Sequence, residues 1–95
     1  AEQLVTRALG ELALTMAGLA ERVRCQNLAL LREDLPRLRR LAREIGLVSL
    51  AEVAGDARAC LDRGDATAFS AVWARLLRVA GVSLSQDPWA ADFLG

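Results

Sequence analysis

The amino-acid sequence predicts an all-α fold, an antiparallel up-down four-helix bundle with a short helical turn at its C-terminal end. Apolar residues make up 54% of the chain but aromatic residues only 4%, so the core must be built mainly from Leu, Ala and Val. Apolar residues also recur at alternating spacings of three and four in successive segments, which is the period of one helix face. These segments are joined by short turns, as in an antiparallel bundle.

The first helix is predicted from one apolar stripe near the N-terminus. The members of this stripe are Val5, Leu9, Leu12, Met16, Leu19 and Val23. The stripe stops at Gln26 and Asn27, where its next apolar residue is missing. We therefore predict a turn at these two residues.

The second helix has an apolar stripe that keeps its phase across a proline. The stripe comprises Leu28, Leu31, Leu35, Leu38, Ala42 and Ile45. Pro36 removes one helical hydrogen bond and clashes with the carbonyl four residues back. Two interpretations stay open: one helix that kinks at Pro36, or a new helix with Asp34 as its cap and Pro36 in its first turn. Gly46 is the predicted C-terminal stop.

The third helix is predicted to begin at a capping box, because Ser49 and Glu52 have the Ser-x-x-Glu spacing. Its inward residues are predicted to be Leu50, Val53, Ala57 and Leu61. We expect this helix to end near Gly64, which suits a left-handed turn, and Asp65 to cap the helix that follows.

The fourth helix is predicted over residues 66–80, with Gly81 ending it. Its buried face is predicted to hold Phe69, Val72, Trp73, Leu76 and Ala80. Beyond it, Asp87 and Pro88 predict a helical turn on which Trp89 and Phe93 share a face. We expect this tail, residues 82–95, to pack on the end of the bundle; an exposed anchor for a partner's groove is the alternative. The whole chain, residues 1–95, is then a single domain.

Composition argues against several classes of partner. The formal net charge is zero, so nothing draws the chain as a whole toward nucleic acid or an anionic membrane. No segment has the ~18 to 20 uninterrupted apolar residues of a membrane span. The first residues carry acids and lack a basic stretch, unlike a signal peptide. We therefore expect a cytoplasmic protein that binds neither nucleic acid nor membrane.

The inventory of reactive side chains is short. The sequence contains no histidine, which excludes an imidazole base, a phosphohistidine and a histidine metal ligand. Cys25 and Cys60 are far apart in sequence and are predicted to be free thiols, Cys60 as part of the core. No glycine-rich phosphate loop occurs. We predict neither a metal site nor a cofactor.

Like charge is concentrated in one place, on the predicted second helix. The residues are Arg32, Arg37, Arg39, Arg40 and Arg43. Positions 32, 36, 39, 40 and 43 fall on one helix face, opposite the apolar stripe, which leaves Pro36 exposed among arginines. A solvated helix face is the usual interpretation of such a run. A docking surface for an acidic protein is the functional alternative, and a nucleic-acid patch suits the neutral chain less well.

Two runs of sequence carry a family resemblance. They are LPRLRRLAREIG (residues 35–46) and LVSLAEVAGDARACLDRGDATAFSAVWARLL (residues 47–77). The segment from Leu31 to Ala80 resembles the histidine-containing phosphotransfer (HPt) family of bacterial two-component phosphorelays. That family is a four-helix bundle with the motif Ala-His-x-Leu-Lys-Gly-x-Ala-x-x-Leu-Gly, a Leu- and Ala-rich helix, then Gly-Asp and the last helix. The structural positions that match it here are Leu38, Ala42, Ile45, Gly46, Gly64 and Asp65.

The same alignment shows where the chain departs from the family. Pro36 stands in place of the phosphoacceptor histidine, Arg39 in place of the lysine, and Arg40 in place of the glycine beside the histidine. Proline has no nucleophilic atom, so phosphoryl transfer by the family mechanism is closed, and we expect the protein not to be an enzyme. The resemblance then implies a protein-binding module that docks the acidic phosphorylation pocket of a receiver domain. The implied partner-binding residues are Arg32, Pro36, Arg37, Arg39, Arg40 and Arg43.

A second hypothesis is a homo-oligomerising helical scaffold with no remaining phosphorelay role. The chain has a surplus of Leu and Ala that would suit contacts between helices of two copies. The first helix is rich in small residues, namely Gly10, Ala13, Ala17 and Gly18, which would let a second copy pack closely. Both hypotheses place function in protein binding, and they differ in the surface used.

Overall fold

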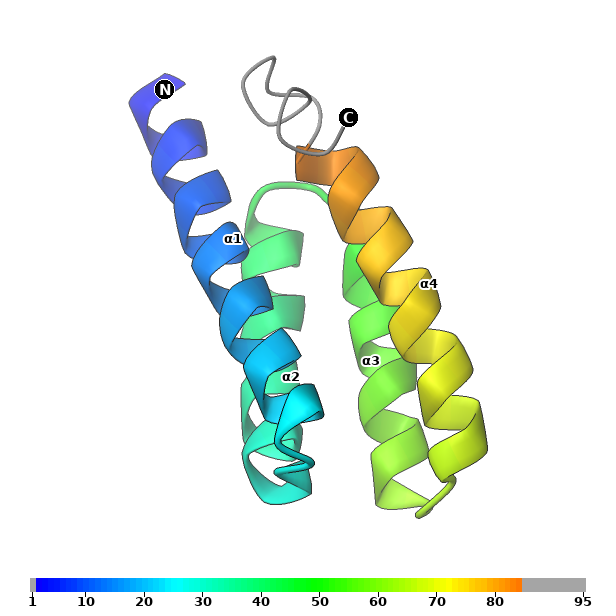
Figure 1. Ribbon diagram of the computed structural model, residues 1–95. Coiled ribbons are helices and arrows are strands. Elements are labelled where there is room, and N and C mark those ends of the chain that lie inside the picture. The colour runs from blue at the N-terminus through cyan, green and yellow to red at the C-terminus, as the bar shows by residue number, and fades with distance from the viewer. Residues whose placement is uncertain (1, 85–95) are drawn as a thin grey trace.

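The chain folds as an antiparallel four-helix bundle, as predicted (Figure 1). The computed structural model describes residues 2–84, and the side chains of residues 6–81. The helices are α1 (Glu2–Arg24), α2 (Leu28–Glu44), α3 (Val48–Asp62) and α4 (Ala66–Leu84). Consecutive helices run in opposite directions, and α2 and α3 form the central pair between α1 and α4. The predicted tail contacts of Trp89 and Phe93, and the turn at Asp87 and Pro88, lie outside the described residues.

One continuous core runs through the bundle and follows the predicted stripes. The buried apolar residues are Leu12, Met16, Leu19, Leu31, Leu35, Leu38, Leu41, Ala42, Leu50, Ala51, Val53, Ala54, Ala57, Cys60, Phe69, Leu76 and Ala80. Partly buried side chains, such as Leu61, Val72 and Trp73, pack against them. Among the predicted inward residues whose side chains the structure describes, Leu28 is the exception: it is the first residue of α2 and is 54% exposed.

Three turns connect the helices, and two of them close on a glycine. Gly46 and Gly64 have φ of +80° and +70°, the left-handed region that favours glycine. After Gly46, the Leu47 N–H donates to the Ala42 carbonyl at 2.8 Å, which is the Schellman pattern. The first turn is at Gln26 and Asn27, as predicted, although no glycine is present there: Gln26 itself adopts φ 56°.

The helix starts are partly as predicted. Asp65 caps α4, since its carboxylate accepts a hydrogen bond from the Ala68 N–H at 3.0 Å. The capping box at Ser49 was wrong: α3 begins at Val48, its N-cap is Leu47, and no side chain caps it. Leu47, directly after the left-handed Gly46, takes the N-cap position, so Ser49 is already inside the first turn.

Two further predictions about the helices are corrected. Gly81 does not end α4, which continues to Leu84, because Gly81 does not adopt the left-handed conformation found at Gly46 and Gly64. A new helix does not begin at Asp34 either. α2 is one helix across Pro36, and the Asp34 carboxylate lies 3.4 Å from Nε of Arg22 on α1.

No helix in the described part of the chain is both long enough and apolar enough to cross a lipid bilayer.

Candidate docking surface

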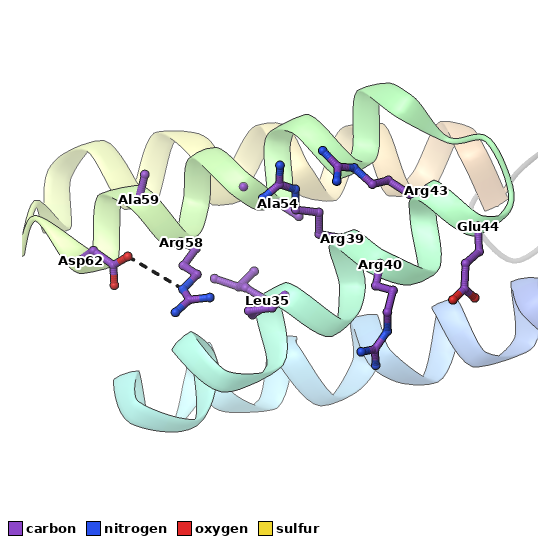
Figure 2. Close-up of a pocket in the computed structure, with 11 residues that line it drawn as sticks. Leu35, Arg39, Arg40, Arg43, Glu44, Ala54, Arg58, Ala59 and Asp62 are labelled. Carbon is purple, nitrogen blue, oxygen red and sulfur yellow. Dashed lines mark ion pairs between the residues drawn. The ribbon is translucent and has the colours of Figure 1, made fainter.

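Four arginines surround a groove between α2 and α3, which we call the arginine groove (Figure 2). Its volume is about 670 Å³. Arg39, Arg40 and Arg43 line it from α2, and Arg58 lines it from α3. The remaining lining residues are Leu35, Pro36, Glu44, Ala54, Gly55, Ala59 and Asp62. The lining therefore combines apolar side chains with more positive than negative charge.

The small residues of α3 give the groove its depth. Ala54, Gly55 and Ala59 line the α3 side, and short side chains there leave the space that the groove occupies. Gly55 also receives Arg39: a methyl group placed on Gly55 would lie 3.7 Å from both Cζ and Nε of Arg39. Arg39 thus reaches across from α2 and rests its guanidinium against the backbone of α3.

Asp62, a lining residue of the groove, takes part in two ion pairs. Asp62 on α3 lies 2.8 Å from the Arg32 guanidinium on α2, and 3.8 Å from Nε of Arg58 one turn earlier on its own helix. All three side chains are about half exposed, so each pair adds little stability, on the order of 0.2–1 kcal/mol. The pairs do neutralise Asp62 and hold Arg58 at the edge of the groove.

The remaining arginines of the groove have no ionic partner. Arg39, Arg40 and Arg43 are exposed and form no ion pair within the described part of the chain. Figure 2 shows Arg39 and Arg43 pointing toward α3, whereas Arg40 points away from it. The charge of these three residues is therefore available to an acidic partner.

The structure separates one of the six sequence-predicted residues from the others. Arg32, Pro36, Arg39 and Arg43 lie on the side of α2 that borders α3, with Arg32 and Pro36 sharing a neighbouring hollow with Arg58; Arg40 lines the arginine groove but points away from α3. The sixth, Arg37, lies between α2 and α1, in a hollow that also contains Glu11, Arg22 and Asp34. Arg37 therefore does not line the arginine groove.

Sequence reasoning missed the contribution of α3. Arg58, with Gly55 and Ala59, was considered only as part of a helix, yet it lines the same groove as the α2 arginines. A signal was present: Gly55, Arg58 and Asp62 recur at spacings of three and four on one helix face, beside small residues rather than large apolar ones. The sequence alone does not show that this face of α3 borders α2, so the pattern could not be assigned to a shared groove.

The two thiols are held in different environments. Cys60 is 3% exposed and belongs to the core, as predicted. Cys25 is exposed and donates a hydrogen bond from its thiol to the Glu21 carboxylate, which raises the pKa of Cys25. The Arg24 guanidinium lowers the pKa of Glu21. Cys25 is therefore less nucleophilic than an ordinary thiol.

The groove offers charge and shape rather than reactive groups. Its lining contains no thiol, and the described residues include no cluster of three or more acidic or cysteine side chains that could hold a metal ion. Arginine remains protonated at any physiological pH, so these residues act as hydrogen-bond donors and fixed charges. The arrangement suits recognition of a carboxylate-rich surface.

Comparison of the chain with models of protein families, with curated proteins and with solved structures returns no match.

Proposed function

We propose that this chain is a non-catalytic, HPt-like binding module of bacterial two-component signalling. It docks a receiver domain through the arginine groove and transfers no phosphoryl group. The acidic phosphorylation pocket of the receiver provides carboxylates for Arg39, Arg40 and Arg43. By occupying that pocket, the module blocks or buffers phosphoryl traffic. The site of this action is the bacterial cytoplasm.

The observation that carries the proposal is the set of unpaired arginines beside an apolar groove. Four arginines of the described residues, Arg22, Arg24, Arg32 and Arg58, have an acidic partner within 4 Å, and the other eight have none. Arg39, Arg40 and Arg43 differ from the other unpaired arginines because all three line one groove, although Glu44 is their neighbour there. Charge complementarity of this kind sets the rate and specificity of protein association.

Pro36 gives the proposal its non-catalytic character. It lines the groove at the position where the resembled family carries its phosphoacceptor, and it is only partly exposed, so the prediction of a fully exposed Pro36 was wrong. Its ring has no atom that can accept a phosphoryl group, yet it leaves an apolar surface among the arginines. A receiver can therefore dock at this position without being discharged.

The test is a calorimetric titration of the chain against the receiver domains of the same genome, each with and without beryllofluoride as a phosphoryl mimic. We expect saturable binding to a receiver, weakened at least about tenfold by Arg39→Glu with Arg40→Glu. Binding should also weaken as salt is raised, because exposed charges are screened.

The matched control carries the same change of charge on a different helix, namely Arg75→Glu with Arg78→Glu on α4, where both side chains are exposed. We expect this variant to bind like the unmodified chain, and both variants to keep their helical circular-dichroism spectrum. Equal loss of affinity in the two variants would mean that net charge, rather than the groove, governs binding. Absence of binding to every receiver would overturn the proposal.

A further inference from the structure

The side of α1 that faces away from the core carries an unusual set of exposed residues. While Leu12, Met16 and Leu19 are buried, the opposite side exposes a row at spacings of three and four. We call this row the outer α1 face; it consists of Arg7, Gly10, Leu14, Ala17 and Glu21. Nothing in the docking of a receiver domain at α2 and α3 uses this face.

Leu14 is the most exposed large apolar residue of the described chain, at 75%. Leu28 and Val48 are also exposed, but each is the first residue of its helix, where apolar exposure is common, and Leu77 inside α4 is less exposed, at 46%. Leu14 instead lies in the middle of the longest helix, with Ala13 and Ala17 exposed around it. Leu14 is therefore a large apolar side chain that projects from a surface of small exposed residues.

The surface around Leu14 has room for a close neighbour. Among the described residues, and apart from the nearby backbone of α1 itself, no atom lies within 4 Å of a methyl group placed on Gly10 or on Gly18, the residues one turn before and one turn after Leu14. The distance between two packed helices depends on the side chains at their contact, so small residues allow the shortest approach. A second helix can therefore lie against α1 with Leu14 at the centre of the contact.

Charge placement identifies the second helix. If two copies of α1 pack antiparallel about a two-fold axis at Leu14, each residue faces a residue of the other copy. The two facing residues lie equally far from Leu14 along the sequence, one before it and one after it. Gly10 then faces Gly18 of the second copy, and Arg7 faces Glu21 of the second copy, each twice. Arg7 forms no ion pair within the described residues, whereas Glu21 already pairs with Arg24 of its own chain, so Arg7 of the second copy would approach a carboxylate that Arg24 also contacts. A parallel pair would instead place Arg7 against Arg7.

We infer that α1 is a homodimerisation helix, through which two copies of this chain pair antiparallel about Leu14, with Arg7 of each copy bound to Glu21 of the other. The inference is independent of the proposed receiver docking, because the outer α1 face and the arginine groove share no residue. Dimerisation through α1 would present two arginine grooves in one particle.

The first test measures the mass of the unmodified chain by sedimentation equilibrium from micromolar concentrations to about 1 mM. We expect a monomer–dimer equilibrium. Leu14→Glu should abolish the dimer, whereas Leu77→Glu, which alters an exposed leucine of α4, should leave it unchanged. A chain that stays monomeric over the whole range, or equal loss in both variants, would overturn the inference.

The second test examines the charge pairing and therefore the antiparallel arrangement. Arg7→Glu and Glu21→Arg should each weaken the dimer about tenfold, because each places like charges opposite one another twice. Combining the two substitutions restores opposite charges and should return the dissociation constant to within about threefold of the original. A double variant that is as weak as the single ones, or weaker, would contradict the antiparallel dimer.

Discussion

The two sides of α2 have opposite characters although they belong to one helix. On the inner side, Leu31, Leu35 and Leu38 are almost wholly removed from water. On the outer side, Arg39, Arg40 and Arg43, which line the arginine groove, remain exposed and lack ionic partners in the described chain. The inner side stabilises the bundle through burial of apolar surface, whereas the arginines contribute almost nothing to folding.

This difference teaches that stability and recognition are separable in α2. A substitution on the inner side should lower the free energy of unfolding and affect binding only through unfolding. A substitution on the arginine side should do the reverse. The predictions below test this separation, from the largest expected change in stability to the smallest.

The largest effect is expected at the inner side. Leu38→Ala removes a side chain that is 0% exposed and leaves a cavity among the four helices. We expect the free energy of unfolding to fall by about 2–5 kcal/mol, measured by urea denaturation. The matched variant Arg40→Ala should change it by less than about 0.5 kcal/mol. Similar losses of stability in the two variants would contradict the separation of stability and recognition in α2.

The next largest change in the free energy of unfolding is expected for Pro36→Ala, and it should be an increase rather than a decrease. It lies inside α2, where proline is about 3 kcal/mol less favourable than alanine. Pro36→Ala should therefore stabilise the bundle, by at most about that amount, in the same denaturation measurement. Receiver binding should be retained, because Pro36 supplies a surface and no reactive atom. Loss of binding with a more stable fold would show that the proline ring itself is recognised.

Gly55 sharpens the comparison from the α3 side. Gly55→Ala should stabilise α3 by about 1 kcal/mol, since alanine is the better helix former and its methyl group would make only ordinary contact with Arg39 at 3.7 Å. Gly55→Leu should instead push Arg39 away and fill the groove. We expect titration to show weaker receiver binding for the leucine variant only. Equal binding by both variants would contradict the assigned position of Arg39.

The smallest change in stability is expected at Asp62. Asp62→Asn removes the ion pairs with Arg32 and Arg58, which should cost about 0.2–1 kcal/mol at low salt and less at high salt. The same change removes a negative charge from the groove lining and frees Arg58. Receiver affinity should therefore rise. A fall in affinity would show that Asp62 positions Arg58 for binding rather than competing for it.

The helices could be predicted from sequence because each has a periodic apolar stripe. Leu12, Leu38 and Leu76 are buried where that period places them. Helix ends were harder, because a local signal acts only if the backbone reaches it in the right geometry. Ser49 lies two residues past the N-cap position, which Leu47 occupies, and Gly81 stays helical.

The candidate site was predictable in part for a related reason. The face formed by Arg39, Arg40 and Arg43 follows from helix geometry within one segment. The groove does not, because it needs Gly55 and Arg58 from α3. Arg37 was grouped with the others by its place in the sequence, but it lies toward α1. Contacts between helices, which periodicity does not specify, decide both outcomes.

The most direct test of the account is to map the receiver contact on this chain by NMR. The backbone amide signals would be followed while a binding receiver domain is added in steps. The account predicts that the largest shifts occur at Arg39, Arg40, Arg43, Gly55 and Arg58, with the outer α1 face unaffected. Shifts centred on α1 or α4 instead, with the arginine groove unchanged, would contradict it.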